Sequence, residues 1–168
     1  DTPMNRFPGP AVWAGRRVLI TGNTGFKGSW LAHWLRALGS DVLGLALPEL
    51  PTHPSLWHEM HLDVETVRAD LCEPGWEAAV RDFRPEAVFH LAAQSIVAEG
   101  YRRPARTFDT NVVGTARLLE SLAGHPDLLC VVVVTTDKVY DPRQQGPYVE
   151  GAFLGGADPY AASKAGTE

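Results

Sequence analysis

The chain has 168 residues, a formal net charge of −5, and hydrophobic and charged fractions of 45% and 21%. This composition is typical of one globular domain, and it excludes a disordered chain and the basic surface of a nucleic-acid-binding protein. The sequence has no apolar run long enough to cross a membrane, so we predict no membrane partner. Cys72 and Cys130 have the spacing of neither a metal site nor a disulfide framework, which predicts no metal and favours a reducing, cytoplasmic setting.

The first ten residues carry three prolines and no apolar segment of a signal peptide. We therefore predict a flexible leader over residues 1–14 and one domain over residues 15–168. Short β-branched runs alternate with amphipathic stretches in this domain. They predict strands over 17–21, 41–46, 66–69, 87–91 and 129–135, and helices over 27–38, 55–60, 74–83, 104–123 and from residue 159 onward.

Two of these helices have an apolar stripe on which we expect them to pack. In the helix over 27–38 the stripe is Trp30, Leu31, Trp34, Leu35 and Leu38. In the helix over 104–123 it is Phe108, Val112, Ala116, Leu119 and Leu122. The run 129–135 is apolar almost throughout, which is typical of a central parallel strand buried on both faces. The whole pattern predicts an α/β fold, a doubly wound parallel sheet of the Rossmann type, with its ligand at the carboxyl ends of the strands.

A glycine-rich segment, Gly22–Gly28, lies between the first strand and the first helix with the spacing G-x-x-G-x-x-G. Glycine permits a tight turn and a close backbone approach to a pyrophosphate. The amide groups at the start of the next helix favour an anion. A tight turn without a ligand is the plainer alternative, but the position in the first βα unit favours a dinucleotide loop.

The end of the second strand bears on the choice between NAD and NADP. A classical NAD site has an acid there for the ribose hydroxyls, and an arginine nearby accommodates a 2′-phosphate. The sequence has neither at Ala46–Pro48, with Glu49 just beyond. We therefore predict that NAD binds more tightly than NADP.

Tyr160 and Lys164 follow a helix start at Asp158-Pro159 and, four residues apart, share one helix face. An ammonium group beside a phenol favours the phenolate, which can accept a proton from a sugar hydroxyl. Alone, an exposed Tyr–Lys pair on a surface helix would be the simpler interpretation. The polar residues Thr136–Lys138 follow the apolar strand, where α/β enzymes place their active sites, and this favours catalysis.

The chain resembles the N-terminal half of extended short-chain dehydrogenases of the NAD-dependent epimerase/dehydratase family, above all the CDP-glucose 4,6-dehydratases. The resemblance lies in segments 21–31, 54–56, 90–95, 111–115, 135–140 and 158–164 and extends over about residues 17–168. Its specific parts are Phe26–Trp30 and Thr136–Lys138, because the glycine and Tyr–Lys motifs occur throughout the superfamily.

The resemblance implies a tightly held NAD and a nucleotide-sugar substrate. The residues that it implies for the pyrophosphate site are Gly22, Thr24, Gly25, Phe26, Lys27 and Gly28. It places Asp70 and Leu71 beside the adenine. It places on the nicotinamide side of the cofactor Leu91, Ala92, Ala93, Gln94, Tyr160 and Lys164. The implied catalytic residues are Thr136, Asp137, Lys138, Tyr160 and Lys164.

The implied reaction converts CDP-glucose to CDP-4-keto-6-deoxyglucose. Tyr160 would take the proton of the 4-hydroxyl as hydride leaves C4, Lys164 would bind the nicotinamide ribose, and Thr136 would hydrogen-bond the 4-hydroxyl. Asp137 and Lys138 would serve the elimination of water across C5 and C6, because oxidation at C4 makes the C5 proton acidic. Hydride would then return to C6. Many relatives that act on dTDP-glucose have a glutamate at the position of Lys138, so the lysine favours the CDP branch.

Two alternatives stay open. One is another nucleotide-sugar 4,6-dehydratase or a 4-epimerase, and an epimerase would need Tyr160 and Lys164 but not Asp137 and Lys138. The other is a non-catalytic dinucleotide-binding module, which the presence of Thr136 beside the Tyr–Lys pair disfavours. The resemblance also implies that the C-terminal substrate domain is absent from this chain. We therefore expect dinucleotide binding without turnover, and a homodimer through helices 104–123 and 159–168.

Overall fold

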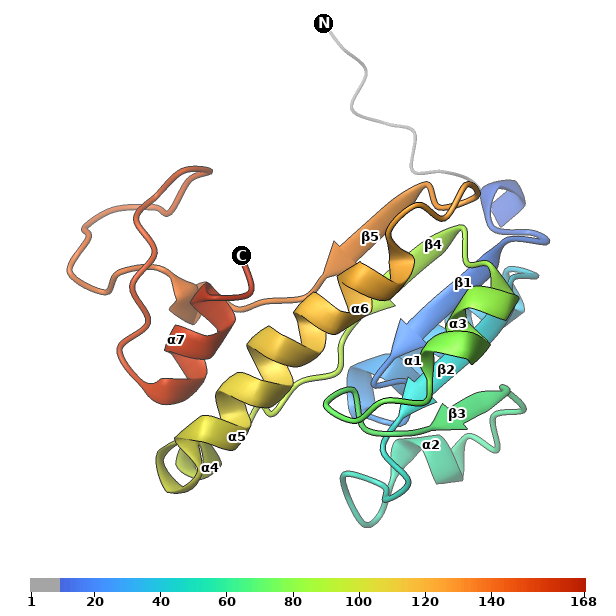
Figure 1. Cartoon of the computed structure of the whole chain (residues 1–168), viewed down its shortest axis with the longest axis horizontal. Coiled ribbons are helices and arrows are strands. Elements are labelled where there is room, and N and C mark those ends of the chain that lie inside the picture. The colour runs from blue at the N-terminus through green and yellow to red at the C-terminus, as the bar shows by residue number, and fades with distance from the viewer. Residues whose placement is uncertain (1–9) are drawn as a thin grey trace, which may run out of the picture.

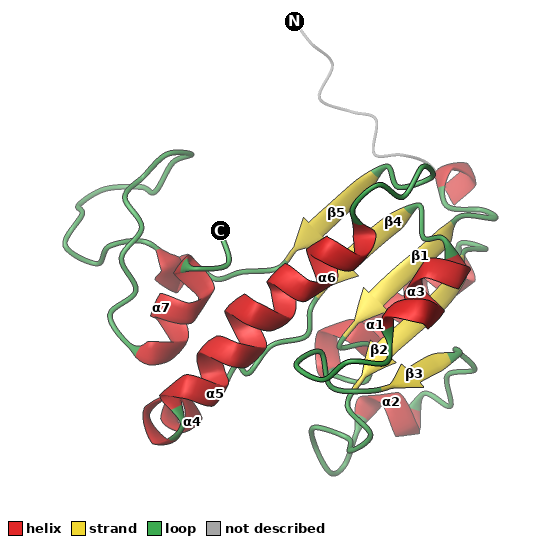
Figure 2. Cartoon of the chain, viewed as in Figure 1, coloured by secondary structure: helices red, strands yellow, loops and turns green. Residues whose placement is uncertain are grey.

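The structure is a computed structural model that describes residues 10–168. Five parallel strands form one sheet in the order β3-β2-β1-β4-β5, with helices on both faces (Figures 1 and 2). The strands are β1 (Arg17–Thr21), β2 (Asp41–Ala46), β3 (Thr66–Arg68), β4 (Ala87–His90) and β5 (Cys130–Val133). The predicted α/β class and doubly wound parallel sheet are confirmed, and each strand lies within its predicted range.

The α-helices are α1 (Phe26–Ala37), α2 (Leu56–Glu59), α3 (Glu77–Phe83), α4 (Val97–Arg102), α5 (Pro104–Phe108), α6 (Gly114–Leu122) and α7 (Pro159–Ala165). Three shorter turns are η1 (Pro10–Val12), η2 (Asp109–Val113) and η3 (Asp137–Val139), of which η2 is π-helical. The predicted helix over 104–123 is confirmed as α5, η2 and α6 in series (Figure 1).

The two faces of the sheet bury separate apolar layers, because successive strand residues point to opposite sides. On one face Leu19 packs with Val80 of α3 and Leu118 of α6. On the other face Val18 packs with Leu35 of α1. Each such side chain, when fully buried, contributes about 1.5–3 kcal/mol to the stability that holds the site's strands in place.

The outer face of α1 carries two tryptophans that the sequence analysis placed in the core. Trp30 and Trp34 are 51% and 63% exposed. The buried face of α1 consists of Gly28, Ser29, Ala32 and Leu35. A Cβ on Gly28 would lie 2.2 Å from the carbonyl oxygen of Gly22, so only small residues fit where the helix meets the loop. The predicted stripe is wrong for the two tryptophans and confirmed for Leu35.

The helix over α5 and α6 also buries a different stripe from the predicted one. Phe108, Ala116 and Leu119 are exposed, whereas Leu122 is buried as predicted. The buried positions are Thr107, Asn111, Gly114, Thr115, Leu118 and Leu122. Three of these side chains are polar and have hydrogen-bond partners, so hydrogen bonding as well as apolar content selects the buried face.

β5 lies at an edge of the described sheet, and not at its centre. It pairs with β4, and Cys130 and Val132 are exposed on the face that α1 covers elsewhere. Val131 packs onto the core on the opposite face. The prediction of a strand buried on both faces is therefore wrong for residues 10–168, because an apolar run does not specify what covers it.

Three further differences concern helix starts. The helix predicted from Pro74 begins at Glu77, because the chain first turns at Gly75, whose φ is +120°. The helix predicted over 55–60 is α2, which begins one residue later at Leu56, and among the described residues the Ser55 side chain makes no capping hydrogen bond. The sequence analysis did not predict α4.

The predicted leader over residues 1–14 falls partly outside the described residues, which begin at Pro10. The ring centroid of Trp13 lies 6.0 Å from that of Phe89. Ser40 Oγ donates a hydrogen bond to the Trp13 carbonyl at 2.9 Å. The chain around Trp13 is therefore part of the fold.

Candidate functional site

The carboxyl ends of the parallel strands lie along one edge of the sheet, and the predicted site residues follow these ends (Figure 1). The glycine loop follows β1, residues 91–95 follow β4, and residues 134–138 follow β5. Helix α7 lies beyond the end of β5 (Figure 1). This edge is where open α/β sheets bind their ligands.

The glycine loop packs directly against the backbone that follows β4. Gly22 has a φ of +71°, and a Cβ on it would lie 2.8 Å from the amide nitrogen of Ala92. Ser29 Oγ donates to the carbonyl of Gly25 at 2.8 Å and ties the helix to the loop. Gly25 precedes α1 without a side-chain cap, so the first amide groups of α1 are available to an anion. These features fit a pyrophosphate.

Three predicted cofactor residues near this loop differ in exposure. Thr24 is buried, whereas Phe26 and Lys27 are exposed at the start of α1. A ligand at the loop could therefore contact the Phe26 ring and the Lys27 ammonium from the solvent side.

Asp70 and Leu71, predicted beside the adenine, follow β3. Leu71 is buried in the core cluster that includes Leu118 of α6, so its side chain is not open to a ligand. The Asp70 carboxylate accepts a hydrogen bond from the amide of Cys72 at 2.9 Å and pairs with Arg106. Desolvation acts to raise the pKa of Asp70, but the hydrogen bonds from Cys72 and Arg106 outweigh it and lower the pKa.

Arg68 lies beside the end of β2, where the sequence analysis found no arginine. It is in register with Ala46, and its Nη1 donates to the carbonyl of Leu47 at 3.3 Å. The sequence around Ala46–Glu49 contains no arginine, but the fold brings Arg68 of the neighbouring strand next to this segment. Arg68 reaches this position because β3 pairs with β2, and the register of that pairing cannot be derived from the sequence.

The segment after β4 brings the predicted residues Leu91–Gln94 to the glycine loop. Leu91, Ala92 and Ala93 are half-buried, and Ala92 donates its N–H to Thr21 Oγ1 at 3.2 Å. Gln94 Nε2 donates to Thr107 Oγ1 at 2.9 Å, and Gln94 Oε1 accepts from the amide of Ile96 at 2.6 Å. The Gln94 side chain thus shapes this loop.

His90 connects β1, β4 and α6 through a buried chain of hydrogen bonds. Its Nδ1 lies 2.6 Å from Thr21 Oγ1, and its Nε2 lies 2.8 Å from Thr115 Oγ1. Thr115 donates its own hydrogen to the Asn111 carbonyl at 2.6 Å, so it accepts from His90 Nε2–H. Burial lowers the pKa of His90 to about 4, with a further contribution from the charge of Lys164, which keeps the imidazole neutral.

Asn111 joins the loop after β4 to α7, and the sequence analysis gave it no role. Its Oδ1 accepts from the Gln94 amide at 2.8 Å. Its Nδ2 donates to the Gln94 carbonyl at 3.0 Å and to Ser163 Oγ at 2.8 Å. A polar residue at a buried helix position was the available signal, but the periodicity assigned the buried face to Phe108 and Val112.

Helix α7 brings Tyr160 and Lys164 to the end of β5. Asp158 caps the helix by accepting from the amide of Ala161 at 2.9 Å, as the predicted helix start requires. Lys164 is buried, and its Nζ donates to the carbonyl of Val134 at 2.7 Å. Desolvation lowers the pKa of Lys164, and the negative charge of Glu168 partly opposes this shift. Tyr160, one helical turn earlier, is half-buried.

The predicted residues Thr136, Asp137 and Lys138 lie in and before η3, which packs against α7. Thr136 Oγ1 accepts from the Lys138 amide at 3.4 Å and donates to Asp137 Oδ1 at 3.1 Å. Asp137 and Lys138 are exposed. The structure thus places one carboxylate and one ammonium group beside the helix of Tyr160, an arrangement that can exchange protons with a bound substrate.

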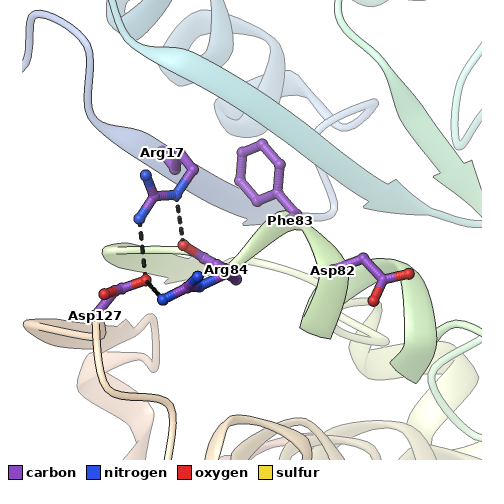
Figure 3. Close-up of a pocket in the computed structure, with 5 residues that line it drawn as sticks. All are labelled: Arg17, Asp82, Phe83, Arg84 and Asp127. Atoms are coloured by element: carbon purple, nitrogen blue, oxygen red, sulfur yellow. Dashed lines mark hydrogen bonds and ion pairs between the residues drawn. The ribbon is translucent and has the colours of Figure 1, made fainter.

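A cavity at the opposite edge of the sheet is lined by Arg17, Asp82, Phe83, Arg84 and Asp127 (Figure 3). The two guanidinium groups of Arg17 and Arg84 lie 3.3 Å and 2.8 Å from Asp127. These paired charges fasten the start of β1 to the segments before β4 and β5, and we assign no ligand to the cavity.

Within residues 10–168, no helix combines the length and apolar character needed to cross a membrane. In the same range, no three His, Cys, Asp or Glu side chains come together as a possible metal site.

Comparisons with known proteins give a consistent result. A family model described as GDP-mannose 4,6 dehydratase matches residues 19–168. Over 156 residues, which are 90% of this chain and 43% of the relative, the chain is 43% identical to the CDP-glucose 4,6-dehydratase of Salmonella typhimurium. Over 157 residues, which are 90% of this chain and 49% of the relative, it is 36% identical to the UDP-glucose 4-epimerase of Mycolicibacterium smegmatis.

A solved structure gives the same picture in three dimensions. The dTDP-glucose 4,6-dehydratase of Streptomyces venezuelae, solved with NAD bound, is similar with a TM-score of 0.77 and 31% identity. The similarity covers 90% of this chain and 48% of that one. The chain thus spans less than half the length of each of these three proteins.

Proposed function

This chain belongs to the GDP-mannose 4,6-dehydratase family, and we propose that it is the NAD-binding part of a 4,6-dehydratase that acts on CDP-glucose. The family membership confirms the resemblance found in the sequence. The main structural support is the bond from Lys164 Nζ to the Val134 carbonyl at 2.7 Å. It brings the Tyr160 helix to the end of β5, on the same edge as the glycine loop. The 43% identity to the Salmonella CDP-glucose enzyme supports the choice of sugar nucleotide.

The proposed cofactor is NAD, and the residues at the edge fit it. Gly22 and Gly28 let the loop backbone pack closely, because a Cβ on either residue would collide with neighbouring backbone atoms. The amide groups at the start of α1 would bind the pyrophosphate. A bound NAD would supply the hydride acceptor for oxidation at the sugar C4 and the hydride donor for reduction at C6.

The residues of α7 would carry out the first proton transfer. We assign Tyr160 as the group that takes the proton of the 4-hydroxyl. Lys164 has three N–H donors and uses one on the Val134 carbonyl. The others could bind the nicotinamide ribose and favour the Tyr160 phenolate.

Thr136, Asp137 and Lys138 would serve the sugar. We assign Thr136 as a hydrogen-bond partner of the 4-hydroxyl, and Asp137 and Lys138 as the groups that move protons during loss of water across C5 and C6. A lysine acts as a base only in its neutral form.

We also propose a homodimer through the helices predicted over 104–123 and 159–168. Phe108 and Leu119 are exposed on the outer side of α5 and α6. An exposed apolar stripe of this kind is typical of a protein interface.

A 4-epimerase is the second candidate function, and the identity to the Mycolicibacterium enzyme favours it. An epimerase and a dehydratase share the Tyr–Lys pair. Asp137 and Lys138 at the end of β5 support the dehydratase, because an epimerase does not eliminate water.

The test is incubation of the whole protein with NAD and CDP-glucose, followed by alkali. We expect the absorbance of a 4-keto sugar, and a smaller signal with UDP-, GDP- or dTDP-glucose. Formation of a 4-epimer without a keto product would support the epimerase instead. Binding of NAD without any product would support a non-catalytic module.

A further inference from the structure

We propose that Arg68 contacts the 2′ substituent of the adenosine ribose and lets this chain hold NADP(H) as well as NAD(H). The inference rests on the proposed dinucleotide site. The sequence analysis predicted that NAD binds more tightly than NADP, on the premise that no arginine lies near the end of β2. The position of Arg68 removes that premise.

The geometry places Arg68 on the face of the sheet that carries the glycine loop. Thr66 and Arg68 are two residues apart on β3, so their side chains point to the same face. The side chain of Asn23, in the glycine loop, donates from Nδ2 to Thr66 Oγ1 at 2.9 Å. Arg68 therefore lies on the loop's side of the sheet, one step nearer the carboxyl edge than Thr66.

The neighbouring strand brings Arg68 to the place where the ribose hydroxyls are expected. Arg68 is in register with Ala46, the last residue of β2. The ribose of a dinucleotide lies at the end of this strand in doubly wound folds. Ala46–Pro48 offers no carboxylate that would bind the 2′-hydroxyl or repel a 2′-phosphate.

The charge of Arg68 is available to a ligand. Its side chain is exposed, and its one side-chain hydrogen bond within the described part of the chain goes to the Leu47 carbonyl at 3.3 Å. Within residues 10–168 no carboxylate lies within ion-pair distance of Arg68, whereas Arg84 and Arg106 pair with Asp127 and Asp70. A guanidinium has five N–H donors in a planar fork that matches the oxygens of a phosphate.

The experiment is calorimetric titration of the 168-residue chain with NADH and with NADPH, before and after Arg68→Ala. We expect the substitution to weaken NADPH binding about tenfold, the size expected for one charge-assisted hydrogen bond, and to change NADH binding less than about twofold. Arg68→Lys should lie between the two, because it keeps the charge and loses the fork.

Arg36→Ala is the matched control. Arg36 is also exposed and also donates to a backbone carbonyl, that of Ser40 at 3.4 Å. It lies near the end of α1, away from the glycine loop, so its loss makes the same change in net charge and should leave both affinities unchanged. Added salt should weaken NADPH binding more in the unaltered chain than in Arg68→Ala.

The outcomes separate this inference from the proposed function. If NADH binds but Arg68→Ala changes the two affinities equally, the inference is overturned and the proposed function is unaffected. If neither dinucleotide binds the unaltered chain, the proposed cofactor site is wrong and the inference falls with it. A selective loss of NADPH affinity in Arg68→Ala, absent from Arg36→Ala, supports it.

Discussion

The glycine loop and α7 lie at two ends of the sheet edge that the carboxyl ends of the strands form, and these two ends are built in different ways. At the glycine loop the backbone itself is packed, since Cβ atoms on Gly22 and Gly28 would lie 2.8 Å and 2.2 Å from backbone atoms. At α7 the polar side chains of His90, Thr115 and Asn111 link the sheet to the helix of Tyr160. The loop depends on the absence of side chains, whereas α7 depends on hydrogen bonds between side chains as well as on Gly156, where a Cβ would lie 2.2 Å from the carbonyl carbon of Ala161.

This difference predicts which substitutions destabilise each end. A single added methyl group should damage the loop, because close-packed backbone has no room to adjust. At the α7 end the loss of a hydrogen bond should also destabilise the fold, because an unpaired buried polar group costs free energy.

The largest effect is expected at Tyr160. In the whole protein, Tyr160→Phe should lower the rate of hydride transfer by a factor on the order of 10² to 10⁴, because the proposed proton acceptor is lost. NADH affinity should change little, since the glycine loop is intact. Stopped-flow absorbance of NADH measures the rate, and near-normal turnover would show that another group takes the proton.

The next effect is at Gly22. Gly22→Ala should lower the free energy of unfolding by about 2–5 kcal/mol, from a strained positive φ and a collision with the Ala92 backbone. Gly124→Ala is the matched control: its φ is +76°, but nothing lies within 4 Å of the added Cβ. The difference in unfolding free energy between the two variants, measured in urea, gives the cost of the collision. Equal losses of unfolding free energy would contradict close backbone packing at the glycine loop.

At the other end, Asn111→Leu keeps a similar volume and removes the hydrogen bonds. It should cost about 2–3 kcal/mol of unfolding free energy, because the Gln94 amide loses its acceptor in a half-buried loop. Gln144→Ala is the control: it removes two exposed hydrogen bonds, one to the Phe153 carbonyl at 2.8 Å and one from the Phe153 amide at 3.4 Å. Limited proteolysis near α7 should increase for Asn111→Leu only, and equal behaviour would show that Asn111 does not hold the helix.

The smallest effect is the pH dependence from His90. Its folded pKa of about 4 lies below the ordinary value of 6.5, so the unfolded chain binds more protons. The stability from the neutral imidazole is therefore present above pH 6.5 and is lost as pH falls toward 4. Between pH 7 and pH 5 the loss should be about 1–2 kcal/mol.

Urea unfolding at the two pH values measures this loss. It should disappear in His90→Gln and persist in His33→Gln, because His33 is exposed on α1. An unchanged slope in His90→Gln would contradict the buried neutral imidazole.

The sequence was sufficient for those parts of the fold that depend on local pattern. Alternating strands and helices, the glycine loop after β1 and the capped start of α7 at Asp158 all follow from short segments. The helix faces did not follow, because apolar periodicity cannot distinguish Trp30 on the outer face of α1 from Leu35 on its inner face. Small residues at Gly28 and Ala32 decide that orientation.

The site was predictable only where its residues belong to continuous motifs. The Tyr–Lys pair and Thr136–Lys138 were identified in this way, and their catalytic roles stay predictions. Arg68 and Asn111 were not identified, because their partners Leu47 and Ser163 are 21 and 52 residues away in the sequence. Strand register and helix packing bring them together, and neither can be derived from the sequence pattern.

The central claim is that the whole protein removes water from CDP-glucose with the groups at the end of β5. The direct measurement is the reaction in deuterated water, followed by NMR of the sugar. We predict a 4-keto-6-deoxy product with deuterium at C5, and loss of C5 exchange in Lys138→Ala while C4 oxidation persists. A product that keeps its C5 proton and its 6-hydroxyl would contradict the claim, and C5 exchange at the normal rate in Lys138→Ala would remove Lys138 as the base.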